Sequence, residues 1–195
     1  MAQQPQQGCT WPGQDELMVQ YHDTEWGVPL HDDRKLFEFM VLDAFQAGLS
    51  WRTILHKREN FRKAFANYDL KKVSKFTEQQ VEELMTDTGI VRNRQKINAA
   101  VINAAKFMEV QKEFGSFDAY IWQFTGHKTL TNQWEADGGI PAKSKESEAM
   151  SKNLLQRGFK FVGPTICYAF MQAAGMVNDH TKGCPRYKAV AKLKA

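Results

Sequence analysis

The chain has 195 residues, a formal net charge of +4, 43% hydrophobic and 12% aromatic residues. This length suits one compact domain, and the apolar content is sufficient for a buried core. No run approaches the ~18 apolar residues of a membrane span, and the polar start of the chain lacks the pattern of a secretory signal. Three scattered cysteines are too few for a disulfide framework, which favours the reducing cytoplasm.

Apolar periodicity predicts helices along most of the chain. The first firm helix is capped by Asp32 or Asp33 and ends at Gly48, and Ser50 caps a second helix directly after it. The segment before these helices, which contains Cys9, has no pattern that predicts order. The predicted helices in this half of the chain cover residues 33–47, 51–65 and 78–88.

The second half of the chain is also predicted to be helical. Residues 125–145 form a polar loop between helices, Pro164 starts the last predicted helix, and Gly175 stops it. The predicted helices here cover residues 92–114, 117–124, 145–157 and 164–174. Since no strand pattern persists, the predicted fold class is all-α. The expected organisation is a disordered leader at 1–8, one domain at 9–184 and a basic tail at 185–195.

Basic side chains gather near two predicted helices. One cluster opens the longest predicted helix, and the other follows His180 without an intervening acid. The clusters are Arg92, Arg94 and Lys96, and Lys182, Arg186, Lys188, Lys192 and Lys194. A solvated face is the usual explanation of one such cluster, but several clusters near a hairpin favour a nucleic-acid partner.

The segment "LLQRGFKFVGPTICYAF" predicts a helix, a tight turn and a second helix. Gly163 allows close backbone approach or positive φ, and Pro164 starts the helix without needing an amide hydrogen bond. The amides of Phe161, Val162 and Gly163, with Lys160 beside them, could bind a DNA phosphate. An ordinary turn between two helices is the alternative.

His180 and Cys184 have a spacing that fits half of a metal site. The candidates for the other half are Cys9, Cys167, His22, His31, His56 and His127. Cys167 lies among apolar residues of a predicted helix and is expected to be a core residue. Cys9 and His22 remain possible partners, although such wide gaps match no zinc-finger pattern.

Asp43 is the one acid on an apolar helix face with Leu36, Met40 and Ala47. Because burying an unpaired charge is costly, this carboxylate either has a partner, lies at the exposed helix end or faces a cavity. Nearby aromatic residues would each be assigned to the core on general grounds.

Several blocks of the sequence, in order, resemble the 3-methyladenine DNA glycosylase I (TAG) family of the helix-hairpin-helix DNA glycosylase superfamily. The resemblance runs from about Cys9 to Cys184. The blocks are "YHDTEWGVP", "LFEFMVLDAFQAGLSW", "KRENFRKAF", "RGFKFVGPTICYAFMQA" and "GMVNDH". It implies the helix-hairpin-helix glycosylase fold with a zinc-binding annex made from the two chain ends.

The resemblance also implies roles for individual residues. Asp43 would be the catalytic, base-recognising acid, at a position where the family usually has Glu. The residues implied to bind the base are Tyr21, Trp51, Trp11, Trp26 and Gln46. Those implied to contact DNA are Leu49, which would fill the gap left by the flipped nucleotide, and Lys160, Phe161, Val162, Gly163 and Thr165. One structural Zn²⁺ would be held by Cys9, His22, His180 and Cys184.

The implied activity is hydrolysis of the N-glycosidic bond of N3-methyladenine in alkylated double-stranded DNA, as a step of base excision repair, with free 3-methyladenine as product. No lyase activity is expected, because Pro164 and Thr165 follow the hairpin glycine where bifunctional relatives have a lysine. Asp179 is expected to orient His180. We expect a cytoplasmic monomer. The alternatives are a non-catalytic DNA-binding module and a glycosylase whose lesion preference is altered by Asp43.

Overall fold

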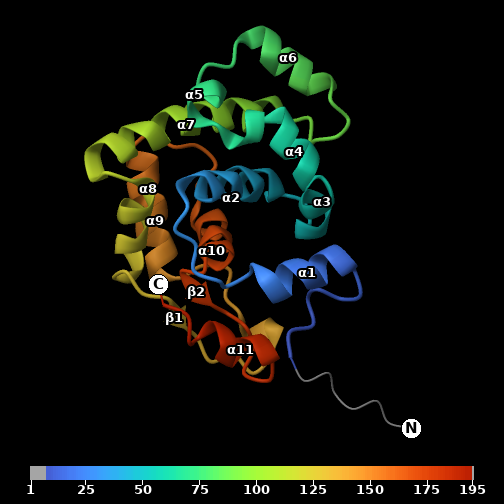
Figure 1. The fold of residues 1–195 in the computed structure, drawn as a ribbon, viewed down its shortest axis with the longest axis vertical. Coiled ribbons are helices and arrows are strands. Elements are labelled where there is room, and N and C mark those ends of the chain that lie inside the picture. Colours follow the sequence, from blue (N-terminus) through green and yellow to red (C-terminus); the bar gives the residue numbers. More distant parts are fainter. Residues whose placement is uncertain (1–7, 195) are drawn as a thin grey trace.

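A computed structural model describes residues 8–194 of the protein, and it is mostly helical (Figure 1). Most of the predicted leader, residues 1–7, and the last residue of the predicted tail lie outside the described residues. The α-helices are α1 (Glu16–Thr24), α2 (Asp33–Gln46), α3 (Trp51–His56), α4 (Arg58–Ala64), α5 (Leu70–Val73), α6 (Glu78–Thr86), α7 (Arg94–Phe114), α8 (Phe117–Ile121), α9 (Lys145–Gln156), α10 (Pro164–Ala173) and α11 (Pro185–Val190).

Short 3₁₀ turns and one pair of strands complete the fold. The turns are η1 (Ala66–Tyr68), η2 (Trp122–Thr125) and η3 (Asp137–Gly139), and the strands are β1 (Leu130–Thr131) and β2 (Val177–Asn178). The strands are parallel, with Leu130 opposite Val177. The all-α prediction therefore holds for nearly all of the regular structure, and the pair of two-residue strands was not predicted.

Helices α2 and α10 lie at the centre of the molecule (Figure 1). Helices α4 to α7 form one end and α1 and α11 form the other, so the first and last helices of the described residues lie at the same end. Every residue of α2 from Leu36 to Phe45 is buried, because the helix has neighbours on all sides. An acid within this buried stretch, such as Asp43, is therefore enclosed by the protein.

Gly175 allows the end of α10 to meet the loop after α1. Its φ is +67°, and a Cβ at this position would lie 2.2 Å from the backbone carbon of Val28. The crossing is fastened by backbone hydrogen bonds from Gly27 to Gln172 and from Leu30 to Ala174. Any side chain at Gly175 would push apart the two segments that carry the candidate site.

One helix prediction was wrong in detail. Residues 51–65 were predicted as one helix, but the helix ends at His56 and restarts at Arg58. The break occurs where consecutive side chains have separate distant partners: Lys57 donates to the carbonyls of Thr88 and Gly89, and Arg58 pairs with acids of other elements. These tertiary contacts outweigh the local helical pattern.

The chain ends are more ordered than their patterns predicted. Helix α1 was missed, although Asp15 caps it by accepting a hydrogen bond from the Met18 amide. Helix α11 lies in the segment interpreted as a basic tail, and its Val190 is buried. No helix within residues 8–194 is long and apolar enough to cross a membrane.

Candidate functional site

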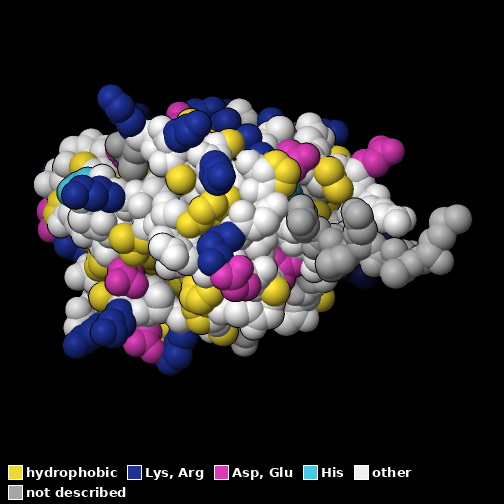
Figure 2. All heavy atoms as spheres, turned by 90° about the horizontal axis from the view of Figure 1, so that it is seen from below, with side chains coloured by type: hydrophobic (Ala, Val, Ile, Leu, Met, Phe, Trp, Pro, Cys, Tyr) yellow, Lys and Arg dark blue, Asp and Glu magenta, His cyan; other side chains and the backbone are white. Residues whose placement is uncertain are grey.

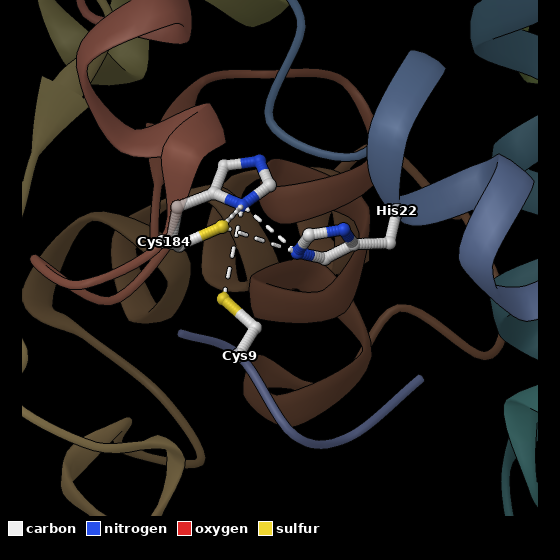
Figure 3. A group of neighbouring side chains, drawn as sticks. Cys9, His22 and Cys184 are labelled. Carbon is white, nitrogen blue, oxygen red and sulfur yellow. Dashed lines mark hydrogen bonds between the residues drawn. The ribbon is translucent and has the colours of Figure 1, made fainter. Parts of the chain in front are cut away.

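The four predicted metal ligands lie close together, and Figure 3 labels three of them, Cys9, Cys184 and His22, which projects from α1. One potential ligand atom from each of Cys9, His22, His180 and Cys184 lies within 4.8 Å of all the others. His22 and His180 approach each other to 3.1 Å through Nε2 and Nδ1, and the Cys184 Sγ lies 3.6 and 3.5 Å from these two nitrogens. The Cys9 Sγ lies 3.8 Å from the same nitrogen of His180.

These spacings are close to those of a single tetrahedral ion. With metal–nitrogen and metal–sulfur bonds of zinc length, ligand atoms would be separated by about 3.3 to 3.8 Å. The second nitrogen of each imidazole is also held: His22 Nδ1 lies 2.7 Å from Asp23, and His180 Nε2 lies 3.0 Å from the Trp26 carbonyl oxygen. Such partners fix the ring orientation of metal-binding histidines. The four residues could therefore hold a metal ion.

Burial lowers the pKa of His180 to about 4, which keeps its imidazole neutral and able to ligate a cation. The remaining histidines are elsewhere. His31 pairs with Asp118, and His56 pairs with Asp15. Cys167 is buried in the core and donates to the Val162 carbonyl, as expected for a core cysteine.

The prediction for Asp179 was wrong. Its two oxygens accept four hydrogen bonds, none of them from His180, and the carboxylate is almost completely buried. The donors are Asn132 Nδ2 at 2.6 Å, Trp134 Nε1 at 2.7 Å, Tyr168 OH at 2.8 Å and Gln172 Nε2 at 2.9 Å. Asp179 thus joins α10 to the loop after β1, and the Trp26 carbonyl holds His180 instead.

A cavity of about 250 Å³ lies next to this cluster, between α1, α2 and α10. All six residues predicted to recognise the base line it. They are Asp43, Tyr21, Trp51, Trp11, Trp26 and Gln46. The aromatic rings contact one another along the wall, with Tyr21 and Trp51 centred 5.1 Å apart and Trp11 and Trp26 5.0 Å apart.

Asp43 is 4% exposed, and its Oδ2 has no hydrogen-bond partner in the described part of the chain. Burial raises the pKa of this carboxyl well above its usual range. The structure therefore excludes a paired Asp43 and an Asp43 exposed at the helix end, and leaves an acid that faces a cavity.

Unpartnered polar atoms are concentrated in this cavity. Among residues 8–194, six buried side-chain nitrogens or oxygens lack a partner, and four of them belong to residues that line it. The four are Trp11 Nε1, Trp51 Nε1, Asp43 Oδ2 and Asp137 Oδ1. Because an unmet buried polar group costs free energy, this concentration marks a place prepared for a polar ligand with both donors and acceptors.

Four lining residues were missed by the sequence analysis: Asp137, Ile140, Ala169 and Gln172. Ala169 and Gln172 lie four and one residues before Ala173, the end of α10, on a helix predicted only as part of the hairpin. Asp137 and Ile140 come from the segment predicted as a polar loop. No pattern in the sequence indicates that a loop residue will lie beside a distant helix.

A second hollow of about 210 Å³ adjoins the cavity and shares Asp43, Gln46 and Ala169 with it. Leu49 and Thr165 line its rim. Leu49 is 43% exposed, which excludes simple core packing for this side chain. The predicted plug residue therefore lies between the cavity and the hairpin.

The predicted hairpin joins α9 to α10. Asn103 of α7 holds its turn by two hydrogen bonds, donating to the Lys160 carbonyl at 2.9 Å and accepting from the Lys160 amide at 2.8 Å. Ser151 and Cys167 donate to the Val162 carbonyl. The turn is thus bound to the protein mainly through its carbonyls.

The amides of Phe161, Val162 and Gly163 make no hydrogen bond within residues 8–194. Phe161 has a φ of +53°, whereas Gly163 has a φ of −64° and so does not need glycine for its dihedral. A Cβ at Gly163 would meet no atom within 4 Å, so the backbone is open to approach there. Lys160 and Thr165 are exposed, but the Val162 side chain is buried, and only its backbone is available to a partner.

The basic cluster at the start of α7 is not a free basic surface. Arg94 pairs with Glu78 and Glu82, and the buried Lys96 donates to the carbonyls of Phe45 and Ala47 at the end of α2. On the face seen in Figure 2, Lys and Arg side chains are spread among acidic and apolar ones. Charge alone therefore does not define an interface on that face.

Comparison with known proteins gives a consistent result. A sequence model of the methyladenine glycosylase family matches residues 11–187. DNA-3-methyladenine glycosylase 1 of Escherichia coli (strain K12) is 48% identical over 179 residues, which cover 92% of this chain and 96% of that protein.

Solved structures have the same fold. A crystal structure of 3-methyladenine DNA glycosylase I superposes with a TM-score of 0.89 at 46% identity, covering 92% of this chain and 98% of the other. A tyrosine-to-phenylalanine variant of 3-methyladenine DNA glycosylase I, solved in complex with 3-methyladenine, gives a TM-score of 0.90 at 34% identity, covering 96% and 98%.

Proposed function

The chain belongs to the methyladenine glycosylase family, and we propose that its aromatic cavity holds an extrahelical N3-methyladenine while the N-glycosidic bond is hydrolysed. The observation that carries this proposal is the cavity itself, where an enclosed carboxyl without a partner, Asp43, lies among Tyr21, Trp51, Trp11 and Trp26. A glycosylase must take its target base out of the stack and hold it in such a pocket.

The chemistry of the lining suits this base. Aromatic faces attract the positive charge of N3-methylated adenine. The adenine edge has an amino donor and ring-nitrogen acceptors, which match the carboxyl oxygen of Asp43 and the indole N–H groups of Trp11 and Trp51. The cavity is also smaller than the roughly 300–1,000 Å³ of pockets for drug-sized ligands, which fits a single base.

The proposed reaction does not require a covalent bond between the protein and the substrate. As the bond from the base nitrogen to C1′ breaks, its electron pair returns to the ring and cancels the positive charge. Water forms the new bond to C1′ and loses a proton to solvent. The sugar carbon C1′ gains the positive charge that the base loses until water attacks it, and an ionised Asp43 nearby would stabilise this developing charge.

We infer hydrolysis without strand cleavage. Pro164 and Thr165 follow Gly163, so no amine is placed at the start of α10. Lys96 is buried and occupied by two carbonyl oxygens at the end of α2. The remaining nearby amine, Lys160, lies on the hairpin surface rather than in the cavity lining.

The hairpin is the proposed contact with the backbone of double-stranded alkylated DNA. Its three free amides and Lys160 suit a phosphate, and Leu49 lies between this turn and the cavity. An apolar side chain there can occupy the gap that a flipped nucleotide leaves. Nothing in this arrangement needs a second copy of the chain, so the proposed working form is a monomer, acting in the cytoplasm.

The proposed metal is one structural Zn²⁺. Two thiols and two imidazoles are ligands that zinc prefers, and four protein ligands leave no position open for catalysis. The ligands come from the start of the chain, α1 and the segment before α11, so the ion would hold together the two ends of the proposed domain, residues 9–184.

Release of free 3-methyladenine from alkylated duplex DNA tests the proposal. The expected result is base release without strand scission; DNA binding with no released base would instead indicate a non-catalytic module. A chromatogram of all released bases tests the remaining alternative, an altered lesion preference. The observation that favours this alternative is Asp43 itself, one methylene shorter than the usual acid of the family.

A further inference from the structure

Asp137 is an acid of the cavity wall that binds the amino-terminal segment with one oxygen only. Its Oδ2 accepts three hydrogen bonds, from the Thr10 amide at 2.6 Å, the Thr10 hydroxyl at 2.8 Å and the Trp11 amide at 2.9 Å. These donors stabilise negative charge on the carboxylate. They also fix the direction in which the other oxygen points.

The other oxygen, Oδ1, is buried and has no partner within residues 8–194. Asp137 lines the same cavity as Asp43, Trp11 and Trp51, whose own unpartnered atoms are described above. A carboxylate oxygen without water or a donor is costly, and a cationic or hydrogen-bond-donating ligand in the cavity would remove that cost.

The loop that carries Asp137 is firmly supported. Asn132 and Trp134 donate to the buried Asp179, and the Lys182 amide donates to the Trp134 carbonyl at 2.8 Å. These bonds attach the loop to β2 (Val177–Asn178) and to the segment that contains the metal ligands. Asp137 is therefore presented to the cavity from a fixed position, as recognition of a small rigid base requires.

We propose that Asp137 is a second base-recognition residue, whose carboxylate faces the cationic N3-methyladenine from a different wall than Asp43. This inference rests on the proposed function. The chain then divides recognition between two acids on unrelated elements, one from α2 and one from the loop at η3. Asp43 is shorter than the glutamate usual in the family, so its charge would lie farther from the base. Asp137 supplies additional negative charge.

The difference in burial between Asp43 and Asp137 supports this division of base recognition between the two acids. Burial raises the pKa of Asp43 well above the ordinary range, so this acid resists ionisation until a cation enters. Asp137 has three donors on one oxygen and is only partly buried as a residue. Within residues 8–194, the protein therefore donates hydrogen bonds to one oxygen of Asp137 and to neither oxygen of Asp43.

The test is the excision of 3-methyladenine from alkylated duplex DNA by Asp137→Asn. An asparagine can still accept from Thr10 and Trp11, but it has no charge. The expected result is a fall in kcat/KM of at least about tenfold, equivalent to ~1.4 kcal/mol. Hydrogen exchange of the Thr10 and Trp11 amides should stay as slow as in the wild type. The matched control is Asp118→Asn, which removes a surface carboxylate paired with His31.

A variant that weakens the hydrogen bonds of the amino-terminal segment but keeps the charge of Asp137 distinguishes base recognition from structural support. Thr10→Ala loses one donor to Asp137, and we expect its kcat/KM to fall less than about threefold. Unchanged kcat/KM in Asp137→Asn would overturn the inference, as would faster exchange of the Trp11 amide in that variant or an equal loss in Thr10→Ala. Failure of the wild type to release the base would instead overturn the proposed function.

Discussion

The cysteine–histidine cluster and the aromatic cavity lie next to each other, but their polar atoms differ in whether they have partners. Tyr21 and His22 are consecutive residues of α1, one in the cavity and one in the cluster, and Trp26 contacts both. In the cluster, each imidazole has one nitrogen near the other ligands and one on a neighbouring acceptor. In the cavity, four buried polar atoms have no partner.

This difference separates a supporting site from a recognising site. A group of ligands that is closed by its own protein partners leaves nothing for a substrate to bind. A cavity wall with unpaired donors and acceptors stays in place only because the surrounding helices hold it. Its free energy falls when a complementary ligand pairs with those groups.

Loss of a metal ligand should have the largest effect. In Cys184→Ala, the bound metal and the order of the amino-terminal segment should be lost together, because metal binding and folding are coupled. We expect Tm to fall by about 10 °C or more, the size of a loss of several kcal/mol in a chain of this length. Metal analysis and thermal unfolding measure both effects.

The matched control for this variant is Cys167→Ala, which removes a buried cysteine outside the cluster and should keep the full metal content. A chelator should speed hydrogen exchange in the segment from Cys9 to Trp11 before it affects the hairpin. Purified protein without zinc, or with zinc that survives Cys184→Ala, would contradict the assignment of the cluster.

Neutralising the enclosed acid of the cavity should abolish most activity while leaving the cluster intact. For Asp43→Asn we expect kcat/KM to fall about a hundredfold, equivalent to ~2.7 kcal/mol, because a charge facing a cationic base is lost. Metal content should not change. Asp43→Glu sharpens the result: excision raised well over tenfold would show that the natural aspartate weakens or redirects the site.

Truncating the exposed side chain at the rim should have a moderate effect on duplex DNA alone. We expect Leu49→Ala to lower excision about tenfold, because the gap left by the flipped nucleotide is no longer filled. Binding of free 3-methyladenine, measured by calorimetry, should stay unchanged. Leu155→Ala is the matched control, since this leucine is exposed on α9 and does not line the cavity. Equal losses in the two variants would remove the proposed role of Leu49.

The pH dependence of stability should show the smallest effect. The folded protein holds the Asp43 proton more tightly than the unfolded chain, whose carboxyl has a pKa near 3.8. As pH rises from this value through the higher folded pKa, the wild type should lose stability relative to Asp43→Asn. We expect a relative change in Tm of about a few degrees. Parallel Tm curves for the two proteins would show that Asp43 titrates normally.

The sequence predicted helix starts correctly where a capping residue or proline comes just before a periodic run of apolar residues. Asp32 caps α2, Thr77 and Gln80 form the capping box of α6, and Pro164 begins α10, as the sequence indicated. The errors lie where distant partners decide. The break at Lys57 depends on carbonyls from residues 88–89 and on acids of α1 and α2, which no local pattern contains.

The candidate site was predictable to different degrees. Resemblance to a family supplied Asp43, Trp51 and the four possible metal ligands. The structure places Asp43 and Trp51 in one cavity and the four ligands in one cluster. Asp137 lies in a loop without such a pattern, so nothing local pointed to it. The role expected for Asp179 was wrong because neighbours in the sequence do not reveal which donors surround a buried carboxylate.

From the sequence alone it follows that the chain is helical, where most helices begin, and that His180 and Cys184 have the spacing of half a metal site. These properties follow from backbone propensity, periodic burial and side-chain chemistry, all of which act within a few residues. The tertiary structure alone decided which polar atoms remain without partners. Hydrogen-bond satisfaction depends on donors and acceptors brought together from opposite ends of the chain, as at Asp137 and Trp11.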